Sequence, residues 1–449
     1  MPHTDPPGIA IAGLGTVGSG VAKILTSHQD EAGFPEIRSV LECEPKKEPA
    51  RKWFERHPEW FKSDLEEILQ DPEVDIIVET IGGVNFARDL TLEAFKRGKH
   101  VVTANKDLIA CHGNVLCKQA EQGQRHYCFE AAVAGAIPVL RLLREYFQTE
   151  DLIQCEGILN GTTNYILSEM ENRGLDFQET LVQAQNLGFA EQDPDNDILG
   201  YDARYKLIIL TYLITGQWFA PSDFRLEGID HLELPDFDYA SRMGKSIKLI
   251  AHLSRHEEHP AGNDTSISPK GQKGGEFLQA YVLPMMIPND AVLAKITGST
   301  NVVSLKGRFS EDITLSGKGA GSLPTASAIV ADLCRIAKNP SSLPCPTPGN
   351  CFHLLPFDDY IFRHTLRFEV LDAPGIVANI GQNLAEKGIN IYALEQLPQY
   401  HRLGEENREL VIFTITLEPC KEGLLQVALK EINQAPFMLK PVNVLRESI

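Results

Sequence analysis

A glycine pattern near the start of the chain limits the fold more than any other feature of the sequence. The segment IAIAGLGTVGSGVAKIL, which begins at Ile9, places the spacing GxGxxG between a strand-like apolar run and a helix-like run. The first glycine permits a tight turn, the second leaves room for a pyrophosphate, and the third lets helix and strand pack closely. The helix N-terminus supplies amide donors for phosphates. The residues expected to contact a dinucleotide here are Gly13, Gly15, Thr16, Val17 and Gly18.

Strands and helices alternate after this turn. A continuous apolar run from Val74 to about Thr80 suits a parallel strand that is covered on both faces. The preceding segment SDLEEILQ predicts a helix with Ser63 as its cap and Glu66 three residues later. A second helix, LTLEAFKRGKH, is expected to end at Gly98, and HVVTANK predicts the next strand. The alternation predicts a Rossmann-like, doubly wound α/β domain.

The sequence changes in character from about Cys128 and predicts an α+β region with a long helix near Asp202–Thr215. Two loop-rich stretches interrupt it, at 256–276 and at 338–358, and the second contains several prolines. Beyond them, apolar segments in the order β-α-β-β-α-β predict a ferredoxin-like module.

Charge and cysteine content narrow the classes of partner. The formal net charge of −19 disfavours nucleic acid and anionic membranes, and solubility is its simpler interpretation. No apolar run approaches the roughly 20 residues of a membrane helix, and the N-terminus lacks a signal-peptide pattern. Nine cysteines without a CxxC pair favour reduced thiols in the cytoplasm. His252, His256 and His259 resemble a metal cluster, but their polar surroundings favour a solvated helix end, and we assign no metal to them.

The second strand of the α/β domain is poorly defined. EIRSVLECEP is the only candidate, and its thin apolar core suggests a shortened strand. A dinucleotide fold usually carries an acidic residue there, about 20 residues after the glycines, and Glu42 or Glu44 could bind a ribose. The basic residues that could instead hold a 2′-phosphate are Arg38, Lys46, Lys47 and Arg51. A solvated charged loop fits equally well, so the choice between NAD and NADP stays open.

Several motifs together resemble those of homoserine dehydrogenases: GLGTVGSG, VETIGG, TANK, EAAVAGAIPVL, ILNGTTNYIL, GFAEQDPDNDILGYDARYK and SGKGAGSLPTASAIVADL. They occur in the family's order and span about Ile9–Ala337. The resemblance implies an NAD(P)-dependent oxidoreductase that interconverts L-homoserine and L-aspartate 4-semialdehyde in threonine, methionine and isoleucine biosynthesis. It also implies a homodimer or homotetramer. The tail DAPGIVANIGQNLAEKGINI resembles an ACT domain, and without a kinase-like segment before the glycines we expect the monofunctional form.

The resemblance and the pattern together predict a division into domains. We expect an NAD(P)-binding domain at 1–130, a catalytic and dimerisation domain at 131–337, a linker at 338–360 and an ACT regulatory domain at 361–449. Residues 317–337 are expected to return to the cofactor domain, because the glycines there run into a helix.

Asp202 and Lys206 are the strongest candidates for chemistry. They lie four residues apart and therefore share a helix face, and the helix continues as LIILTYLITG, which is apolar enough to be buried. Taken alone, such a pair is more often a surface salt bridge. A lysine ammonium beside a carbonyl can stabilise the charge that grows on the oxygen during hydride transfer and then donate a proton. The resemblance implies that Lys206 is this general acid.

Other site residues follow from the resemblance. Lys106 closes a parallel strand at the edge where α/β sheets bind ligands, and the family match implies a substrate or cofactor contact, with a share in proton transfer. Glu191 and Asp202 match positions that bind the amino group and hydroxyl of homoserine. Thr80, Gly319 and Gly321 are expected to contact the cofactor. An exposed loop lysine and solvated carboxylates are the simpler alternatives.

The segment EAAVAGAIP surrounds one carboxylate with small apolar residues. Exposed carbonyls and a carboxylate suit a hard cation, whereas close packing explains the small residues equally well. The resemblance implies a monovalent site, typically sodium, at Glu130 with the carbonyls of Val133, Gly135 and Ile137.

In the C-terminal module, Asp372 to Gly375 form a strand-to-helix turn where a ligand carboxylate could sit, and Asn390 begins the next strand. We expect this module to sense an amino acid, with L-threonine as the candidate, unless it only dimerises. Two other interpretations of the whole chain stay open. One is an ACT-bearing amino-acid or nucleotide sensor without catalysis, and the other is a reductase of another small aldehyde.

Overall fold

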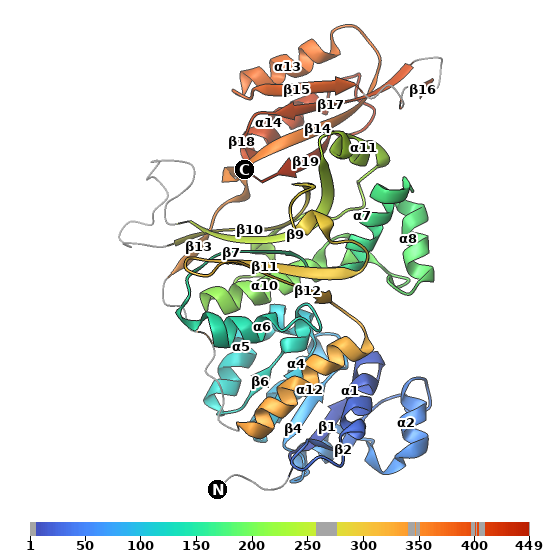
Figure 1. Ribbon diagram of the computed structural model, residues 1–449, viewed down its shortest axis with the longest axis vertical. Helices are drawn as coiled ribbons and strands as arrows, with labels where there is room; N and C mark the ends of the chain where they lie inside the picture. Colours follow the sequence, from blue (N-terminus) through green and yellow to red (C-terminus); the bar gives the residue numbers. More distant parts are fainter. Residues whose placement is uncertain are drawn as a thin grey trace.

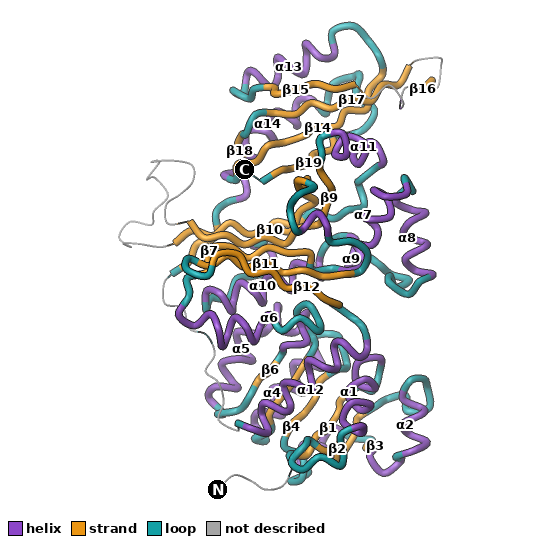
Figure 2. The backbone as a smooth tube through the Cα atoms, in the orientation of Figure 1, coloured by secondary structure: helices purple, strands orange, loops and turns teal. Residues whose placement is uncertain are grey.

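The computed structural model describes residues 6–256, 276–339, 346, 351–396, 400, 402–403 and 409–448. Figure 1 shows an elongated molecule with the N-terminal domain below, a broad sheet in the middle and a C-terminal module above. Figure 2 shows that helices and strands account for most of each part. His259 and residues 340–345 and 347–350 of the predicted linker lie outside the described residues. Within the described ranges, no helix is both long and apolar enough to cross a membrane.

The N-terminal sheet contains six parallel strands in the order β3-β2-β1-β4-β5-β6 among the described residues. The strands are β1 (Gly8–Ala12), β2 (Glu36–Leu41), β3 (Phe61–Lys62), β4 (Ile76–Glu79), β5 (His100–Thr103) and β6 (Tyr127–Cys128). The connecting helices are α1 (Thr16–Ser27), α2 (Ala50–Arg56), α3 (Leu65–Gln70), α4 (Asn85–Lys96) and α5 (Lys106–Gln122). This order confirms the doubly wound nucleotide-binding sheet, because the order reverses beside β1.

Two local predictions for this domain are wrong. Strand β2 is not shortened, since five of its six residues pair along the whole of β1, and Ser39 and Val40 are fully buried. Its outer neighbour β3 is the short strand, with two residues. The cap of α3 is Asp64, whose carboxylate accepts the Glu66 amide at 3.0 Å, and the Ser63 hydroxyl donates instead to Glu67.

A late helix, α12 (Ser322–Lys338), completes the core of this domain. It packs against α1, and Figure 1 shows it beside the N-terminal strands although its colour places it much later in the chain. Its Ala326, Ile329 and Leu333 are buried in one apolar cluster with Ile9 and Ile11 of β1. The nucleotide-binding sheet therefore shares its core with residues from the far end of the catalytic region.

The middle sheet is antiparallel along β12-β11-β7-β9-β10. Its strands are β7 (Leu152–Ile158), β9 (Lys245–His256), β10 (Glu276–Pro288), β11 (Thr300–Gly307) and β12 (Glu311–Lys318), with the short β8 (Arg225–Leu226) and β13 (Phe352–Leu354) beside β10. Its main helices are α7 (Gly161–Arg173), α8 (Phe177–Asn186), α9 (Asp195–Ile198), α10 (Tyr201–Thr215) and α11 (Leu234–Arg242).

The histidines at 252 and 256 lie on strand β9, so the predicted helix end is wrong. His252 is 5% exposed, stacks on the Tyr281 ring at 4.7 Å and lies 3.3 Å from the Glu156 carboxylate. Among the described residues, no group of three or more His, Cys, Asp or Glu side chains is arranged to hold a metal.

The C-terminal module has the order β-α-β-β-α-β. Its elements are β14 (Ile361–Leu371), α13 (Ile376–Glu386), β15 (Ile391–Gln396), β17 (Glu409–Leu417), α14 (Glu422–Ile432) and β19 (Asn443–Glu447), with the short strands β16 (Arg402–Leu403) and β18 (Cys420–Lys421). Strand β19 pairs with β14 and, through Arg446 opposite Met285, with β10. The middle sheet therefore continues into this module as one sheet.

Candidate active site

Lys206 and Asp202 form a buried ion pair on the first turns of α10. The Lys206 ammonium lies 2.6 Å from Oδ2 of Asp202 and donates to the Leu159 carbonyl at 2.7 Å. Both residues are only 7% exposed. The helix begins after Gly200, whose positive φ of 81° sets the entry angle. Because α10 is largely apolar beyond this turn, the pair sits at the end of a buried helix as the sequence predicted.

Lys106 supplies a second ammonium to the same carboxylate. Its Nζ lies 3.3 Å from Oδ1 of Asp202, and its side chain remains 33% exposed. Lys106 is the first residue of α5, directly after β5, and Asn105 caps that helix. The carboxyl edge of the nucleotide-binding sheet therefore meets the start of α10 at Asp202.

Asn160 organises the carboxylates of this site. Its Nδ2 donates to Asp202 at 2.8 Å and to Asp197 at 2.6 Å, while its Oδ1 accepts the Thr163 amide and caps α7. Burial alone would raise the pKa of Asp202, but the ammoniums of Lys206 and Lys106 and the donated hydrogen bonds outweigh it and lower the pKa to about 2. Asp202 is thus held as an anion.

The pKa values of two neighbouring groups, Asp197 and Lys106, are raised. Burial and the negative charge of Asp202 raise the pKa of Asp197. For Lys106, burial acts to lower the pKa, but the carboxylates of Asp202 and Asp107 more than offset it and raise the pKa. The site therefore holds its lysine charge beside a fixed carboxylate.

The glycine loop fits a dinucleotide. A Cβ on Gly18 would stand 2.1 Å from the Gly13 carbonyl oxygen, so only glycine permits this approach of helix and strand. A Cβ on Gly15 would meet nothing within 4 Å, which leaves open space where a pyrophosphate would lie. Gly13 has a φ of 90°, and Thr80 fixes the turn because its hydroxyl donates to the Gly13 carbonyl at 2.7 Å. Thr16 and Val17 begin α1 and present their amides there.

Gly319 and Gly321 lie where the chain passes from β12 to α12. A Cβ on Gly319 would stand 1.9 Å from the amide nitrogen of Asn301, which itself donates to the Leu159 carbonyl. Directly after Gly321, the Ser322 hydroxyl donates to the Thr16 carbonyl at 2.6 Å. These contacts bring the late glycines beside both the cofactor loop and the carbonyl that holds Lys206.

The Glu130 loop follows β6 and packs against α12. The Glu130 carboxylate accepts the Leu140 amide at 3.0 Å, and its backbone amide donates to the Asp332 carboxylate. Burial and the nearby Asp332 raise the pKa of Glu130 to about 7. Gly135 has a positive φ of 54°, and Ile137 and Val133 are buried on either side of it.

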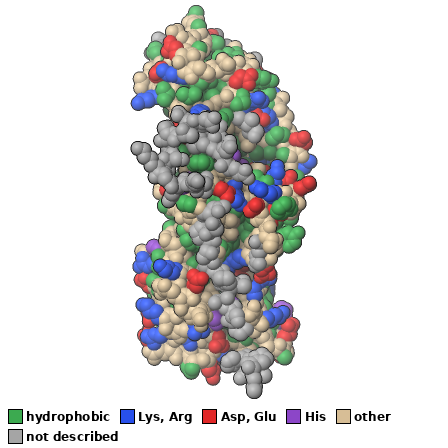
Figure 3. Space-filling model, turned by 90° about the vertical axis from the view of Figure 1, so that its left-hand side faces the viewer, with side chains coloured by type: hydrophobic (Ala, Val, Ile, Leu, Met, Phe, Trp, Pro, Cys, Tyr) green, Lys and Arg blue, Asp and Glu red, His purple; other side chains and the backbone are tan. Residues whose placement is uncertain are grey.

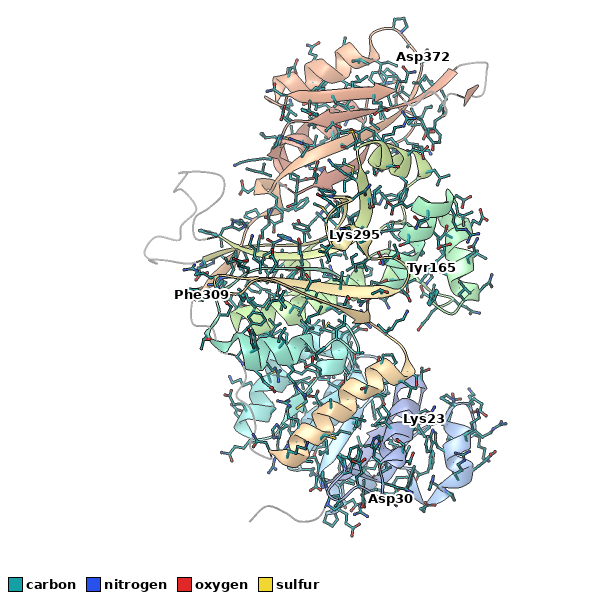
Figure 4. All side chains as sticks on the ribbon, viewed as in Figure 1. Lys23, Asp30, Tyr165, Lys295, Phe309 and Asp372 are labelled. Carbon is teal, nitrogen blue, oxygen red and sulfur yellow. The ribbon has the colours of Figure 1, made fainter. Side chains whose placement is uncertain are left out.

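Four predicted residues lie away from this cluster. Glu191 is exposed, and its carboxylate contacts neither Asp202 nor the two lysines in the described part of the chain. Asp372, Gly375 and Asn390 are exposed on the C-terminal module, and Figure 4 labels Asp372 at its outer end, far above the catalytic helices.

Sequence reasoning missed three residues that shape the site. Asn160 and Asp197 lie within motifs that indicated the family, but their mutual hydrogen bond joins residues 37 positions apart. Glu79 is fully buried, accepts the Thr103 hydroxyl at 2.6 Å and accepts the Ile81 amide, so it ties the ends of β4 and β5 together. A carboxylate at the end of an apolar strand was the available signal for Glu79.

Comparison with known proteins agrees with this geometry. Residues 13–130 match the model for the NAD-binding domain of homoserine dehydrogenase, and residues 138–334 match the model for homoserine dehydrogenase. The Synechocystis homoserine dehydrogenase is 35% identical over 98% of both chains, and that of Neisseria gonorrhoeae is 34% identical over 98% of both. The Thiobacillus denitrificans structure aligns with a TM-score of 0.84 and 31% identity, covering 99% of this chain and 98% of that one. The chain belongs to the homoserine dehydrogenase family.

Proposed function

We propose that this enzyme interconverts L-homoserine and L-aspartate 4-semialdehyde by hydride transfer, with Lys206 as the proton donor in the direction of reduction. The observation that carries the proposal is the buried Lys206–Asp202–Lys106 cluster at the carboxyl edge of the nucleotide-binding sheet. A nicotinamide cofactor, when bound, supplies the hydride. Gly13, Gly15, Thr16, Val17 and Gly18 would hold its pyrophosphate, and Thr80, Lys106, Gly319 and Gly321 would line its reactive end.

Proton transfer depends on how Lys206 is held. Two of its three N–H bonds are directed at Asp202 and the Leu159 carbonyl, which leaves one to donate to the substrate oxygen. As negative charge grows on that oxygen, the paired ammoniums of Lys206 and Lys106 stabilise it. The carboxylate of Asp202 keeps both ammoniums in place and is available to the substrate hydroxyl.

The substrate ammonium needs a carboxylate of its own. Glu191 is proposed for this role together with Asp202. Because Glu191 is exposed, the role requires its loop to fold inward over bound substrate. Oδ1 of Asp197 accepts a hydrogen bond from Asn160 Nδ2 at 2.6 Å, so this carboxylate lies next to Asp202. We propose it as a further partner for the substrate ammonium.

A steady-state assay with L-homoserine and each nicotinamide cofactor tests the proposal. We expect cofactor reduction that requires homoserine and that is lost in Lys206→Ala. A protein that binds the cofactor but shows no turnover would support the sensor without catalysis. Turnover of other small hydroxy compounds in preference to homoserine would support the alternative reductase.

Sodium is proposed at Glu130 with the carbonyls of Val133, Gly135 and Ile137. The support is a turn in which both Ala134 and Gly135 have positive φ, beside a buried carboxylate. Activity measured in sodium and in choline salts at equal ionic strength tests the site, and equal rates in both would refute it.

The C-terminal module is proposed as an ACT domain that senses L-threonine through Asp372, Gly375 and Asn390. Its β-α-β-β-α-β order and the positive φ of 91° at Gly375, which opens α13, support this role. A homodimer or homotetramer in the cytoplasm completes the proposal. We expect threonine to inhibit the full-length enzyme and Asn390→Ala to weaken the inhibition. An unchanged rate across millimolar-scale threonine would leave the module with dimerisation alone.

A further inference from the structure

Glu42 occupies the position that discriminates between nicotinamide cofactors in dinucleotide folds. It follows β2 directly, and β2 ends beside the glycine loop, because the Gly13 amide donates to the Leu41 carbonyl at 2.9 Å. In such folds the residue at this end of the second strand faces the ribose on the adenine side. The ordered β2 therefore gives Glu42 a defined place that the thin apolar pattern did not predict.

Two backbone amides orient the Glu42 carboxylate. Oε2 accepts the Leu14 amide at 2.7 Å, and Oε1 accepts the Glu44 amide at 3.0 Å. A carboxylate offers about four acceptor sites, so each oxygen keeps one for a further donor. The two vicinal hydroxyls of an unmodified ribose can each donate a hydrogen bond to one oxygen of this carboxylate. A 2′-phosphate supplies none and brings roughly two negative charges against the carboxylate.

We infer that this enzyme binds NAD(H) in preference to NADP(H), with Glu42 as the residue that determines the preference. The inference rests on the proposed function, since it names which cofactor the dehydrogenase uses. A dinucleotide fold alone is compatible with both cofactors, so the preference must come from individual side chains such as Glu42.

The basic residues around β2 do not offset Glu42. Arg38 pairs with Glu36 at 3.0 Å, and Lys47 pairs with Glu44 at 2.5 Å. Arg51 pairs with Glu48 at 2.8 Å. Three of the four basic residues that the sequence offered to a 2′-phosphate therefore already face a carboxylate.

Lys46 and Lys52 have no ion pair among the described residues and need a separate account. Lys52 lines a hollow of about 500 Å³ together with Thr16 and Ser19 of α1 and Ser322 of α12. This wall contains the N-terminus of α1, which is where a pyrophosphate binds. Because both cofactors carry the same pyrophosphate, Lys52 strengthens the binding of both. Lys46 lies on the turn after Glu44, and of the four basic residues that the sequence offered to a 2′-phosphate it is the one without a carboxylate partner in the described chain.

The test measures direct binding of NADH and of NADPH to the full-length protein by fluorescence titration or calorimetry. We expect the wild type to bind NADH at least about tenfold more tightly than NADPH, since a like charge opposite the 2′-phosphate opposes binding. Glu42→Gln should narrow the ratio mainly by improving NADPH, and Glu42→Arg should reverse it. Glu31→Gln is the control, because Glu31 is exposed before β2 and has no ion pair among the described residues. This change removes a carboxylate of the same domain without freeing a cation, so the ratio should stay unchanged.

Several results would overturn the inference. Tighter NADPH binding by the wild type would do so, as would an unchanged ratio in a folded Glu42→Gln protein. A Lys46→Ala variant that lost NADPH alone would move the determinant to that lysine. Homoserine oxidation that proceeds best with NADP⁺ would refute the preference while leaving the proposed function intact. A chain that bound neither cofactor would refute both.

Discussion

The molecule contains two clusters of buried charge that are built differently. At the active site, Lys206 and Lys106 share Asp202, and the Lys106 side chain is one-third exposed. Between the middle sheet and the C-terminal module, Arg446 is 1% exposed and donates four hydrogen bonds, to Glu422 and Glu227, at 2.7–3.1 Å.

The two clusters differ in what they leave unbonded. Arg446 uses four of its five N–H groups and directs all three guanidinium nitrogens at carboxylates, and Glu422 also accepts from His364 at 2.9 Å. We call this second cluster closed, because each nitrogen of its buried cation has a carboxylate partner. The active-site cluster keeps one N–H of Lys206 without a partner in the described chain. A proton donor must retain an N–H group to offer the substrate, whereas a cation that fixes an interface is best surrounded by carboxylates.

The largest expected effect is on turnover. Lys206→Ala should lower kcat by roughly 10²–10⁴-fold, the range for a lost general acid or base, with a smaller change in KM. Lys245→Ala is the matched control, because that lysine pairs with Glu447 at 2.6 Å outside the site. Near-normal kcat in folded Lys206→Ala protein would remove Lys206 from the mechanism.

A substitution in the closed cluster should lower stability and leave turnover nearly unchanged. Arg446→Met leaves the Glu422 and Glu227 carboxylates without their main partner, and removing one side of a buried pair costs about 3–5 kcal/mol of unfolding free energy. Chemical denaturation of the full-length protein measures the loss. At a temperature where the variant stays folded, kcat should change less than twofold, on the order of 0.4 kcal/mol in barrier height. A loss of stability below about 1 kcal/mol would mean that water already satisfies these carboxylates.

Asn160→Ala should have an intermediate effect, because Asn160 acts through Asp202 and Asp197. Losing a hydrogen bond to a charged group costs about 1.5–3 kcal/mol, so kcat/KM should fall by about 10–100-fold. The pKa of Asp202 should rise because one of the bonds to its ionised form is gone, and the acidic limb of the pH–rate profile should move to higher pH. A loss of thermal stability without this shift would show that Asn160 only caps α7.

The sequence predicted the part of the site that local spacing determines. Asp202 and Lys206 lie one helical turn apart, and the glycine loop is a contiguous segment, so both follow from periodicity. The bond between Asn160 and Asp202 spans 42 residues, and no local pattern contains it. The spacing of His252 and His256 fits a helix face and predicts a helix end, whereas the structure has them on β9, whose pairing with β10 is not visible in the sequence.

The same limit explains the outcome for the fold. Parallel strands that are buried on both faces have a clear apolar signature, and the nucleotide-binding sheet was predicted from it. The continuation of the middle sheet through β19 depends on a pairing between Arg446 and Met285, across 161 positions of chain. Arg446 is a charged residue in a short strand, so the sequence pattern does not indicate that it is buried between β10 and β14.

The smallest expected effect concerns Glu130. Its pKa in the folded protein is about 7, above the ordinary 4.5, so ionisation opposes folding, and stability falls as pH rises from about 4 to 7. Glu130→Gln removes this dependence and should gain about 1–3 kcal/mol relative to wild type between pH 4 and pH 8. The gain should shrink in sodium salts if the ion binds the ionised carboxylate. A flat difference between the two proteins would refute the raised pKa.

The place of α12 has a consequence for how the protein reaches its native state. The Ser322 hydroxyl bonds to the Thr16 carbonyl across 306 positions, and the core around β1 includes Ala326, Ile329 and Leu333. During synthesis from the N-terminus, the apolar residues of the first strands therefore stay partly uncovered until α12 has left the ribosome, after the whole middle region of the chain. A fragment that stops at 130 should aggregate, whereas a fusion of residues 6–130 to 317–339 through a short linker should fold as a nucleotide-binding unit.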